Sequence, residues 1–418
     1  MMFRKHLSIL LVIAFIFTSS VGCQRATISP GGGAASSGDA SDDVQEVYKI
    51  GFLAAITGGG SALGEPERDV AVMLQKQLDA EGGIVGPDGV RRQVKLLIYD
   101  TQTDGGTAIS VVKKLIEDEG VVGLIGPTTS PVAMALLPVV QEAELPIISM
   151  ASSSAIVEPV AERKWVFKVA QSNEHTSPWQ VKYVKAKGMT RVANLYVDNA
   201  YGLDGAEAIR RTAEAEGVEI VLEDTFAADD KDMTGQLTKI RASNAEAVLV
   251  TAIPPAAAIF TKQYREMGLT LPLLHNSGVA MKPFIDLAGV ENVEGVIFPM
   301  GKLVATYELP DDDPQKAVLI EFVERFREET GKEPSTFAGH AWDSIFIMTE
   351  ALATLESGLS LAEQRRQLRD AIENTKGFVG VDGVFNFAPD DHVGLSMDDI
   401  VLAKITDGDW VYFPPEDW

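Results

Sequence analysis

Residues 121–155 constrain the fold most, because they hold two short apolar runs separated by one helical pattern. The runs at residues 121–125 and 145–148 are bounded by Gly and Pro, and they predict buried parallel strands. Each run is followed by a cluster of small hydroxyl residues. Ligands of open α/β sheets bind outside the carboxyl ends of the strands, so both clusters are expected at a binding edge.

The first cluster, Thr128, Thr129 and Ser130, runs directly into Pro131 and an apolar helical segment. Serine is a preferred N-cap and proline a preferred first helical residue, so Ser130 is predicted to cap this helix. Helix N-termini that carry free N–H groups and hydroxyls bind anions. A second cluster at residues 152–154 adds hydroxyls at the same edge. The alternative, a simple helix cap and a solvated loop, is disfavoured by the occurrence of two such turns after adjacent strands.

The composition is that of a globular protein that does not bind nucleic acid. The chain has 418 residues, enough for two or three domains, and 46% of them are hydrophobic. Its formal net charge is −24, whereas binding to the phosphates of nucleic acid requires a basic face. We therefore expect neither a nucleic acid partner nor attraction to anionic lipid.

The N-terminus is typical of an exported lipoprotein. Two basic residues precede a mostly apolar segment, residues 7–17, which is too short to span a bilayer. Small residues then lead to Cys23, the single cysteine, in a pattern that resembles a bacterial lipobox. We predict a signal peptide at residues 1–22, a lipid on Cys23, a flexible Gly- and Ser-rich tether at residues 23–45, and an extracytoplasmic body held at the membrane. A generic export signal that happens to contain a cysteine is the alternative.

Strands and helices alternate along most of the chain. Apolar runs at residues 47–53 and 93–99, each followed by a helical pattern, join the central stretch in a parallel sheet with helices on both faces. A second, similar unit is predicted to begin near residues 165–170, with further strands at residues 192–197, 219–223, 247–252 and 271–274. Three helices then follow with little strand between them, at residues 314–330, 339–355 and 361–375, and they are expected to cover the first unit. The chain ends in a hairpin-like segment at residues 380–387 and a pair of strands at residues 400–405 and 410–413, joined by an Asp-Gly turn.

Motifs of enzyme cofactor sites are missing from the sequence. The glycine-rich residues 58–64 lack dinucleotide-binding spacing, and there is no phosphate-binding loop and no nucleophile elbow. The five histidines show no metal-binding spacing. His275 and His340 fall in candidate turns, where a structural role as a hydrogen-bonding group is the more common one. We expect binding rather than catalysis, with no cofactor and no metal.

A series of short motifs runs from residue 47 to the C-terminus: YKIGFLAAITG, AEGGIVG, VKLLIYDTQTD, GLIGPTTSP, LPIISMASSS, YVDNAYGLDG and GHAWDSI. Their order and spacing resemble the type I periplasmic solute-binding proteins, in particular the leucine/isoleucine/valine-binding branch of ABC importers. The resemblance implies two doubly wound, Rossmann-like parallel-sheet lobes joined by a three-crossover hinge, which close on a ligand in the cleft. By analogy, lobe 1 comprises residues 47–171 and 300–391, and lobe 2 comprises residues 172–299 and 392–418.

The resemblance also implies a ligand site. In this family, hydroxyl turns of the first lobe hold the ligand carboxylate, and the matching positions here are Thr128, Thr129, Ser130, Ala151, Ser152 and Ser153. The cleft aromatics of the family match Tyr201 and Trp342. Either aromatic residue is also compatible with a place in the core.

Two positions depart from the family pattern. Amino acid binders have a glutamate that pairs with the ligand ammonium where this chain has Ser277, and a pocket tyrosine where it has Leu63. A buried ammonium group without a carboxylate partner is costly. Either another acid, Glu65 or Asp198, pairs with the ammonium, or the ligand is a carboxylate without an amine, aromatic acids included.

The sequence thus predicts a monomeric, non-catalytic solute-binding protein that delivers a small carboxylate-bearing ligand to an ABC permease. One alternative is a ligand-sensing receptor component with the same bilobed body. The other is a Rossmann-type enzyme, which no cofactor motif supports.

Overall fold

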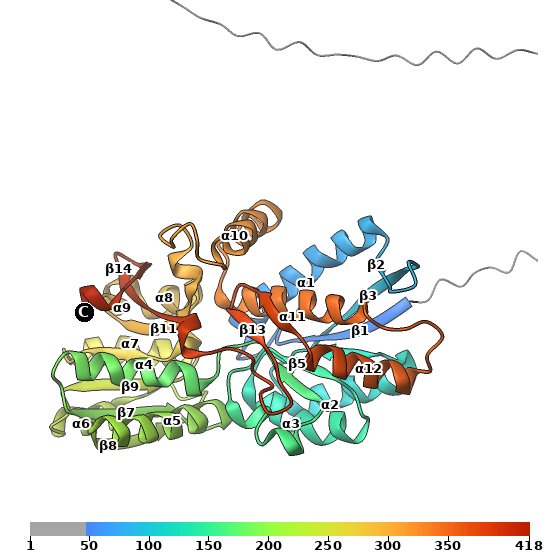
Figure 1. Cartoon of the computed structure of the whole chain (residues 1–418). Coiled ribbons are helices and arrows are strands. Elements are labelled where there is room, and N and C mark those ends of the chain that lie inside the picture. Colours follow the sequence, from blue (N-terminus) through green and yellow to red (C-terminus); the bar gives the residue numbers. More distant parts are fainter. Residues whose placement is uncertain (1–46) are drawn as a thin grey trace, which may run out of the picture. The chain divides into compact units, whose positions relative to one another are not determined.

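The computed structural model describes residues 47–418. The predicted signal peptide, Cys23 and the tether therefore lie outside the described residues. Within the described range the chain forms two mostly parallel sheets with helices packed on them (Figure 1). None of the helices in this range combines the length and the apolar character that a membrane span requires.

The first sheet has six strands in the order β2-β3-β1-β4-β5-β6. These are β1 (Val47–Ala54), β2 (Ile84–Val85), β3 (Arg91–Asp100), β4 (Gly123–Ile125), β5 (Ile147–Ser149) and β6 (Val166–Lys168). All neighbours run parallel except β2 and β3. The connecting helices are α1 (Ser61–Glu81), α2 (Gly105–Lys114) with its π-helical extension η1 (Leu115–Glu119), and α3 (Ser130–Glu142). Strands β4 and β5 are completely buried, as expected for runs covered on both faces.

The second sheet has seven strands in the order β15-β14-β11-β10-β9-β7-β8. Its strands are β7 (Arg191–Val197), β8 (Glu219–Phe226), β9 (Ala247–Thr251), β10 (Leu273–His275), β11 (Ile297–Gly301), β14 (Ile400–Thr406) and β15 (Asp409–Tyr412). Only β14 and β15 are antiparallel to their neighbours. The helices of this part are α4 (Asn173–Ala186), α5 (Ala200–Glu216), α6 (Thr234–Ala242), α7 (Ala256–Glu266), α8 (Lys282–Ala288) and α9 (Val290–Val293).

Short 3₁₀ turns complete the connections. They are η2 (Ser154–Ile156), η3 (Val160–Glu162), η4 (Ser277–Val279), η5 (Lys302–Ala305), η6 (Met397–Asp399) and η7 (Pro415–Asp417). The turn between β14 and β15 has positive φ at Asp407 and Gly408, +53° and +77°. Two successive residues in this region make the tight hairpin turn that the Asp-Gly pair predicts.

Two sequence-based expectations about element boundaries are wrong. Residues 165–170 do not open the second unit, because β6 pairs in parallel with β5 and closes the first sheet. An apolar run shows that a strand is buried but not which strand lies beside it. The predicted hairpin at residues 380–387 is also shifted, since its strands are β12 (Lys376–Val379) and β13 (Val384–Asn386).

The three late helices are confirmed as α10 (Lys316–Thr330), α11 (Thr336–Leu352) and α12 (Leu361–Glu373). Helix α11 packs along α1 and contacts β4 and β5, so these helices return to the first sheet (Figure 1). The chain therefore passes between the sheets after β6, after β11 and after β13. The predicted α/β class with two doubly wound sheets and three crossovers is confirmed.

Arg365 ties α12 to the first sheet. Its guanidinium donates to the carbonyl oxygen of Val121 from Nε at 3.1 Å and from Nη2 at 2.9 Å, and to that of Ala143 from Nη1 at 3.2 Å. The side chain is buried, so these carbonyls have little access to water. The next residue, Arg366, points to solvent and pairs with Glu144 at the surface.

Replacing Arg365 by Met should lower the free energy of unfolding by about 2–4 kcal/mol, because buried charge-assisted hydrogen bonds are lost and carbonyl groups stay unpaired. Arg366→Met is the matched control and should cost less than about 1 kcal/mol, since its ion pair is exposed. Urea unfolding of both variants measures the difference. Equal losses would contradict the role of Arg365 in fixing α12.

Candidate ligand-binding site

A cavity of about 320 Å³ lies between the two sheets, at the carboxyl ends of their parallel strands. The first sheet contributes residues that follow its strands, among them Gly59, Thr103, Thr128, Met150 and Gln171. The second sheet contributes Asn199, Ala228, Ile253 and Ser277 in the same way. A volume of this size, at an edge where strands end, is typical of a small-molecule site.

The predicted cap of α3 is wrong by one residue. Thr129 is the N-cap, with the extended backbone angles φ −116° and ψ 143°, and Ser130 is the first helical residue. Pro131 therefore occupies the second helical position. A backbone N–H at this position would have no intrahelical partner, so the missing N–H of proline costs no hydrogen bond. The Ser-Pro pair alone does not distinguish the two arrangements. Instead of capping α3, the Ser130 Oγ accepts the Ser153 N–H at 3.2 Å.

The hydroxyls of the first turn differ in what they offer a ligand. Thr129 Oγ1 is buried and has no hydrogen-bond partner among the described residues. Ser130 Oγ accepts from Ser153, which leaves its own proton free to donate. Thr128 Oγ1 accepts the Ala55 N–H at 2.8 Å and lies 2.5 Å from Oε2 of Glu67. All three line the cavity, so free hydroxyl donors face it at the N-terminus of a helix.

In the second turn alternate residues face the cavity, and its residue Ser153 has extended backbone angles, φ −61° and ψ 134°. Met150 and Ser152 line it, whereas Ala151 and Ser153 are buried outside the lining. This alternation follows from the two-residue period of extended backbone. The sequence therefore places four residues in the correct turn but does not show which of them point inward.

Lys168 holds this turn by a hydrogen bond from the side away from the cavity, a role that the sequence does not reveal. It is fully buried at the end of β6, and its Nζ donates to the carbonyl oxygen of Ser152 at 2.6 Å. Burial lowers the pKa of Lys168 to about 7. The signal that could have found it is a lysine at the end of an otherwise apolar strand.

On the second-sheet side, Tyr201 and Ser277 line the cavity, and Leu63 of α1 lines it opposite them. The Tyr201 hydroxyl accepts the Gly278 N–H at 3.1 Å. Burial raises the pKa of Tyr201 to about 12, so the phenol is neutral at physiological pH. The structure thus gathers the predicted tyrosine and both departures from the family pattern around one space.

The two acids proposed for a ligand ammonium do not reach this space. Glu65 and Asp198 are exposed, and neither lines the cavity. Among the described residues that line it there is no Asp, Glu, Lys or Arg. The cavity therefore offers hydroxyls, amides and apolar side chains, but no fixed negative charge.

Trp342 does not belong to the lining, so its expected place in the cleft is wrong. It is 2% exposed and packs edge-on against Phe322 of α10 at 5.4 Å between ring centroids, with Phe346 at 4.8 Å. Three other residues of α11 line the cavity instead, Thr336, Phe337 and His340. Their spacing of i, i+1 and i+4 defines one helix face, from which residue 342 is rotated away.

His340 is the histidine of the lining, and the sequence had favoured a structural role for it. Its Nδ1 lies 2.6 Å from Oδ2 of Asp382, and both side chains are almost completely buried. Gln171 Nε2 donates to the same carboxylate at 3.0 Å. His275, in contrast, is a core residue, hydrogen-bonded to Thr261 at 2.8 Å.

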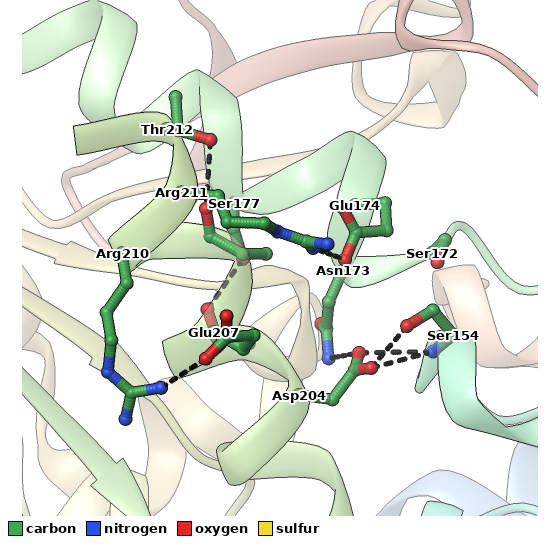
Figure 2. Close-up of polar contacts among 12 residues, drawn as sticks. Ser154, Ser172, Asn173, Glu174, Ser177, Asp204, Glu207, Arg210, Arg211 and Thr212 are labelled. Carbon is green, nitrogen blue, oxygen red and sulfur yellow. Dashed lines mark hydrogen bonds and ion pairs between the residues drawn. The ribbon is translucent and has the colours of Figure 1, made fainter. Parts of the chain in front are cut away.

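A polar network joins the two sides beside the cavity (Figure 2). Asp204 of α5 accepts the Ser154 N–H at 3.1 Å and also the Ser154 hydroxyl. Asn173 Nδ2 donates to the other oxygen of the same carboxylate at 2.7 Å. Ser154 follows β5 of the first sheet, and Asp204 lies on α5, which follows β7 of the second sheet, so the bonds between these two residues link the two sides.

Comparisons with known proteins agree with this geometry. A family model described as "Periplasmic binding protein" matches residues 47–409. An "Amino acid binding protein" of Pseudomonas aeruginosa is 28% identical over 309 residues, which are 72% of this chain and 77% of that protein. A "Leucine-, isoleucine-, valine-, threonine-, and alanine-binding protein" of the same organism is 21% identical over 73% of this chain and 78% of its own length.

Solved structures show the same architecture. An extracellular ligand-binding receptor from Rhodopseudomonas palustris superimposes with a TM-score of 0.81 and 29% identity, over 88% of this chain and 100% of that one. A branched-chain amino acid transporter substrate binding protein from Streptococcus pneumoniae, solved with isoleucine, gives a TM-score of 0.74 at 24% identity, over 88% of this chain and 99% of its own. The second similarity is one of fold alone.

Trp342→Ala should lower the free energy of unfolding by about 3–5 kcal/mol, because it empties a closely packed aromatic site between α10 and α11. Tyr307→Ala removes an aromatic side chain that is 56% exposed, and it should change the free energy of unfolding by less than about 1 kcal/mol. Thermal or urea unfolding compares the two. A small loss for Trp342→Ala would contradict its place in the core.

Proposed function

Because the chain belongs to the periplasmic binding protein family, in its type I branched-chain amino acid branch, we propose that it is an extracytoplasmic solute-binding protein of an ABC importer. The observation that carries this proposal is the cavity itself. It is lined from both sheets, and free hydroxyl donors face it at the N-terminus of α3. The relatives named above are described as amino acid binding proteins, which supports a small carboxylate-bearing ligand.

Hydroxyl and helix-terminus donors suit a carboxylate. Each charge-assisted hydrogen bond contributes roughly 1.5–3 kcal/mol, and the helix N-terminus favours negative charge. We place the ligand carboxylate at Thr129, Ser130 and Ser152, with Tyr201 and Ser277 closing over it from the other side. Ala151 and Ser153 keep a supporting role, since they shape the second turn.

The remainder of the ligand meets an apolar, acid-free space. Leu63, Met150, Ile253 and Phe337 are among its lining residues. A buried ammonium group would find no carboxylate there, and its desolvation would remain largely uncompensated. The lining therefore favours an amine-free or aromatic carboxylate. An amino acid is the second candidate, supported by the descriptions of the relatives; its ammonium group would have to bind neutral oxygens such as those of Tyr201 and Ser277.

Ligand capture is proposed to work by hinge closure. Lobe 1, at residues 47–171 and 300–391, and lobe 2, at residues 172–299 and 392–418, would turn about the three crossovers. The bonds from Ser154 of lobe 1 to Asp204 of lobe 2 cross between the lobes and would hold the closed form, and Asn173 orients the Asp204 carboxylate from within lobe 2. A ligand that touches both lobes stabilises that form through its additional contacts.

The body is proposed to act as a monomer, tethered by a lipid on Cys23 and docking on a membrane permease. A receptor component that signals through a separate membrane partner would use the same cavity and the same closure. The two roles differ in the partner that recognises the closed form.

A thermal-shift screen on residues 24–418 tests the ligand class, after unfolding and refolding to remove any bound molecule. It pairs leucine with 4-methylpentanoate and phenylalanine with 3-phenylpropanoate, which differ only in the amine. At 100 times its dissociation constant a ligand adds about 2.7 kcal/mol, or a few degrees in Tm. We expect shifts with the amine-free acids. Shifts with the amino acids alone would favour the second candidate, and none with either would contradict a carboxylate ligand.

Ser130→Ala should weaken binding of the responding acid about tenfold or more, because it removes a hydroxyl donor at the proposed carboxylate position. The free energy of unfolding should fall by about 1–3 kcal/mol, because the buried Ser153 N–H loses its acceptor, and the N-cap Thr129 stays in place. Isothermal titration calorimetry with parallel thermal unfolding separates the two effects. Unchanged affinity would refute the proposed role of Ser130, and Ser110→Ala, on the exposed side of α2, serves as the control.

A further inference from the structure

The Thr128 hydroxyl occupies a position where one proton has two possible directions. Its Oγ1 accepts the Ala55 N–H at 2.8 Å and lies 2.5 Å from Oε2 of Glu67 on α1. A hydroxyl has one proton and two lone pairs, and the Ala55 N–H occupies one lone pair. The hydrogen bond to Glu67 therefore decides whether the Thr128 proton is available to the cavity that this residue lines.

Glu67 is placed where ionisation is unfavourable. Its side chain is 0% exposed, and its other oxygen, Oε1, is buried with no hydrogen-bond partner among the described residues. Burial raises the pKa of Glu67 well above its ordinary value, opposed by the Thr128 hydrogen bond. An ionised carboxylate here would keep an unpaired, buried anionic oxygen, which a neutral carboxylic acid avoids.

Titratable groups on the neighbouring elements have partners of their own. They are Lys49 on β1 with Glu119, Asp100 on β3 with Thr57, Arg325 on α10 with Gln77, and on α11 His340 with Asp382 and Asp343 with the N–H groups of residues 381 and 382. On α1 itself, Asp69 pairs with Arg68 and with Lys332. None of these groups bonds to Glu67, so its protonation acts on the site through Thr128.

We propose that Glu67 is a positioning residue whose protonated form turns the Thr128 hydroxyl toward a bound carboxylate. Neutral Glu67 donates its O–H to the second lone pair of Thr128 Oγ1, and Thr128 then donates to the ligand. Ionised Glu67 accepts the Thr128 proton instead and adds a negative charge behind the site. The inference rests on the proposed function, because it requires an anionic ligand at the first hydroxyl turn.

The direction of the pH dependence follows from linkage. A bound carboxylate favours protonated Glu67, so the pKa of Glu67 is higher in the complex than in the free protein. Affinity for the carboxylate is then greatest below the pKa that Glu67 has in the free protein, and it falls as the pH rises through that pKa. Loss of one charge-assisted hydrogen bond, together with repulsion from Glu67, corresponds to a decrease of about tenfold or more.

Titration calorimetry with 4-methylpentanoate and 3-phenylpropanoate, from about pH 6 to about pH 9, tests this role, since free carboxylic acids of this kind stay ionised throughout that range. Glu67→Gln keeps the shape and an N–H donor for Thr128 but cannot ionise. Glu65→Gln removes an exposed carboxylate two residues away and is the matched control. Over this pH range we expect the affinity of wild type and of Glu65→Gln to fall by about tenfold more than the affinity of Glu67→Gln. Lys168 also titrates near the site, and because all three proteins contain it, the difference isolates Glu67.

Infrared difference spectra of wild type against Glu67→Gln test protonation without any ligand. A carboxylic acid C=O band at neutral pH, present only in wild type, is the expected result, and a carboxylate band in its place would overturn the proposal. Thr128→Val removes the hydroxyl and should also flatten the dependence of affinity on pH. This variant provides the test if Glu67→Gln does not fold stably. Tight binding with parallel profiles in wild type and Glu67→Gln would refute the role of Glu67 alone. No binding of either acid by wild type would refute the proposed ligand class and this role with it.

Discussion

Parallel strand direction is the constraint on which this site depends. The parallel strands of each sheet all end at the same edge, so the loops that follow them gather there without any long-range design of the sequence. The chain passes between the sheets three times, and the two edges face one cavity. Residues as distant in sequence as Leu63 and His340 thereby line the same space. Local turn chemistry then decides what that space can bind.

The turns are held from behind by buried polar side chains that do not line the cavity. Lys168 donates a hydrogen bond to the carbonyl oxygen of Ser152 in the second turn, and Glu67 contacts the hydroxyl of Thr128 in the first. Asp382 is hydrogen-bonded to His340 and orients it. Each of these groups is buried, where a hydrogen bond is stronger and an unpaired charge is costlier than in water. The turns are consequently fixed before a ligand arrives, which reduces the entropy lost on binding.

Much of the fold could be predicted from the sequence, because buried parallel strands appear as apolar runs between Gly and Pro. The hydroxyl turns were also visible, since Thr128 to Ser130 and Ser152 directly follow such runs. The predictions that failed depended on which strand lies beside another and on which face of a helix points inward. The run at β6 did not reveal its neighbour, and the motif around Trp342 did not reveal that Phe337 and His340 form the inward face. Glu67 is one of many carboxylates, and a single sequence pairs none of them with Thr128.

Selectivity in such a cavity is decided by which ligand charge is left without a partner. The lining offers hydroxyl donors and a helix N-terminus to a carboxylate, whereas it offers only neutral oxygens, among them that of Ser277, to an ammonium group. An unpaired polar group rejects a ligand more strongly than a missing apolar contact does. We therefore propose that a single residue on the second-sheet side, Ser277, distinguishes carboxylates with an amine from carboxylates without one. The apolar lining can change to fit the rest of the ligand without disturbing that distinction.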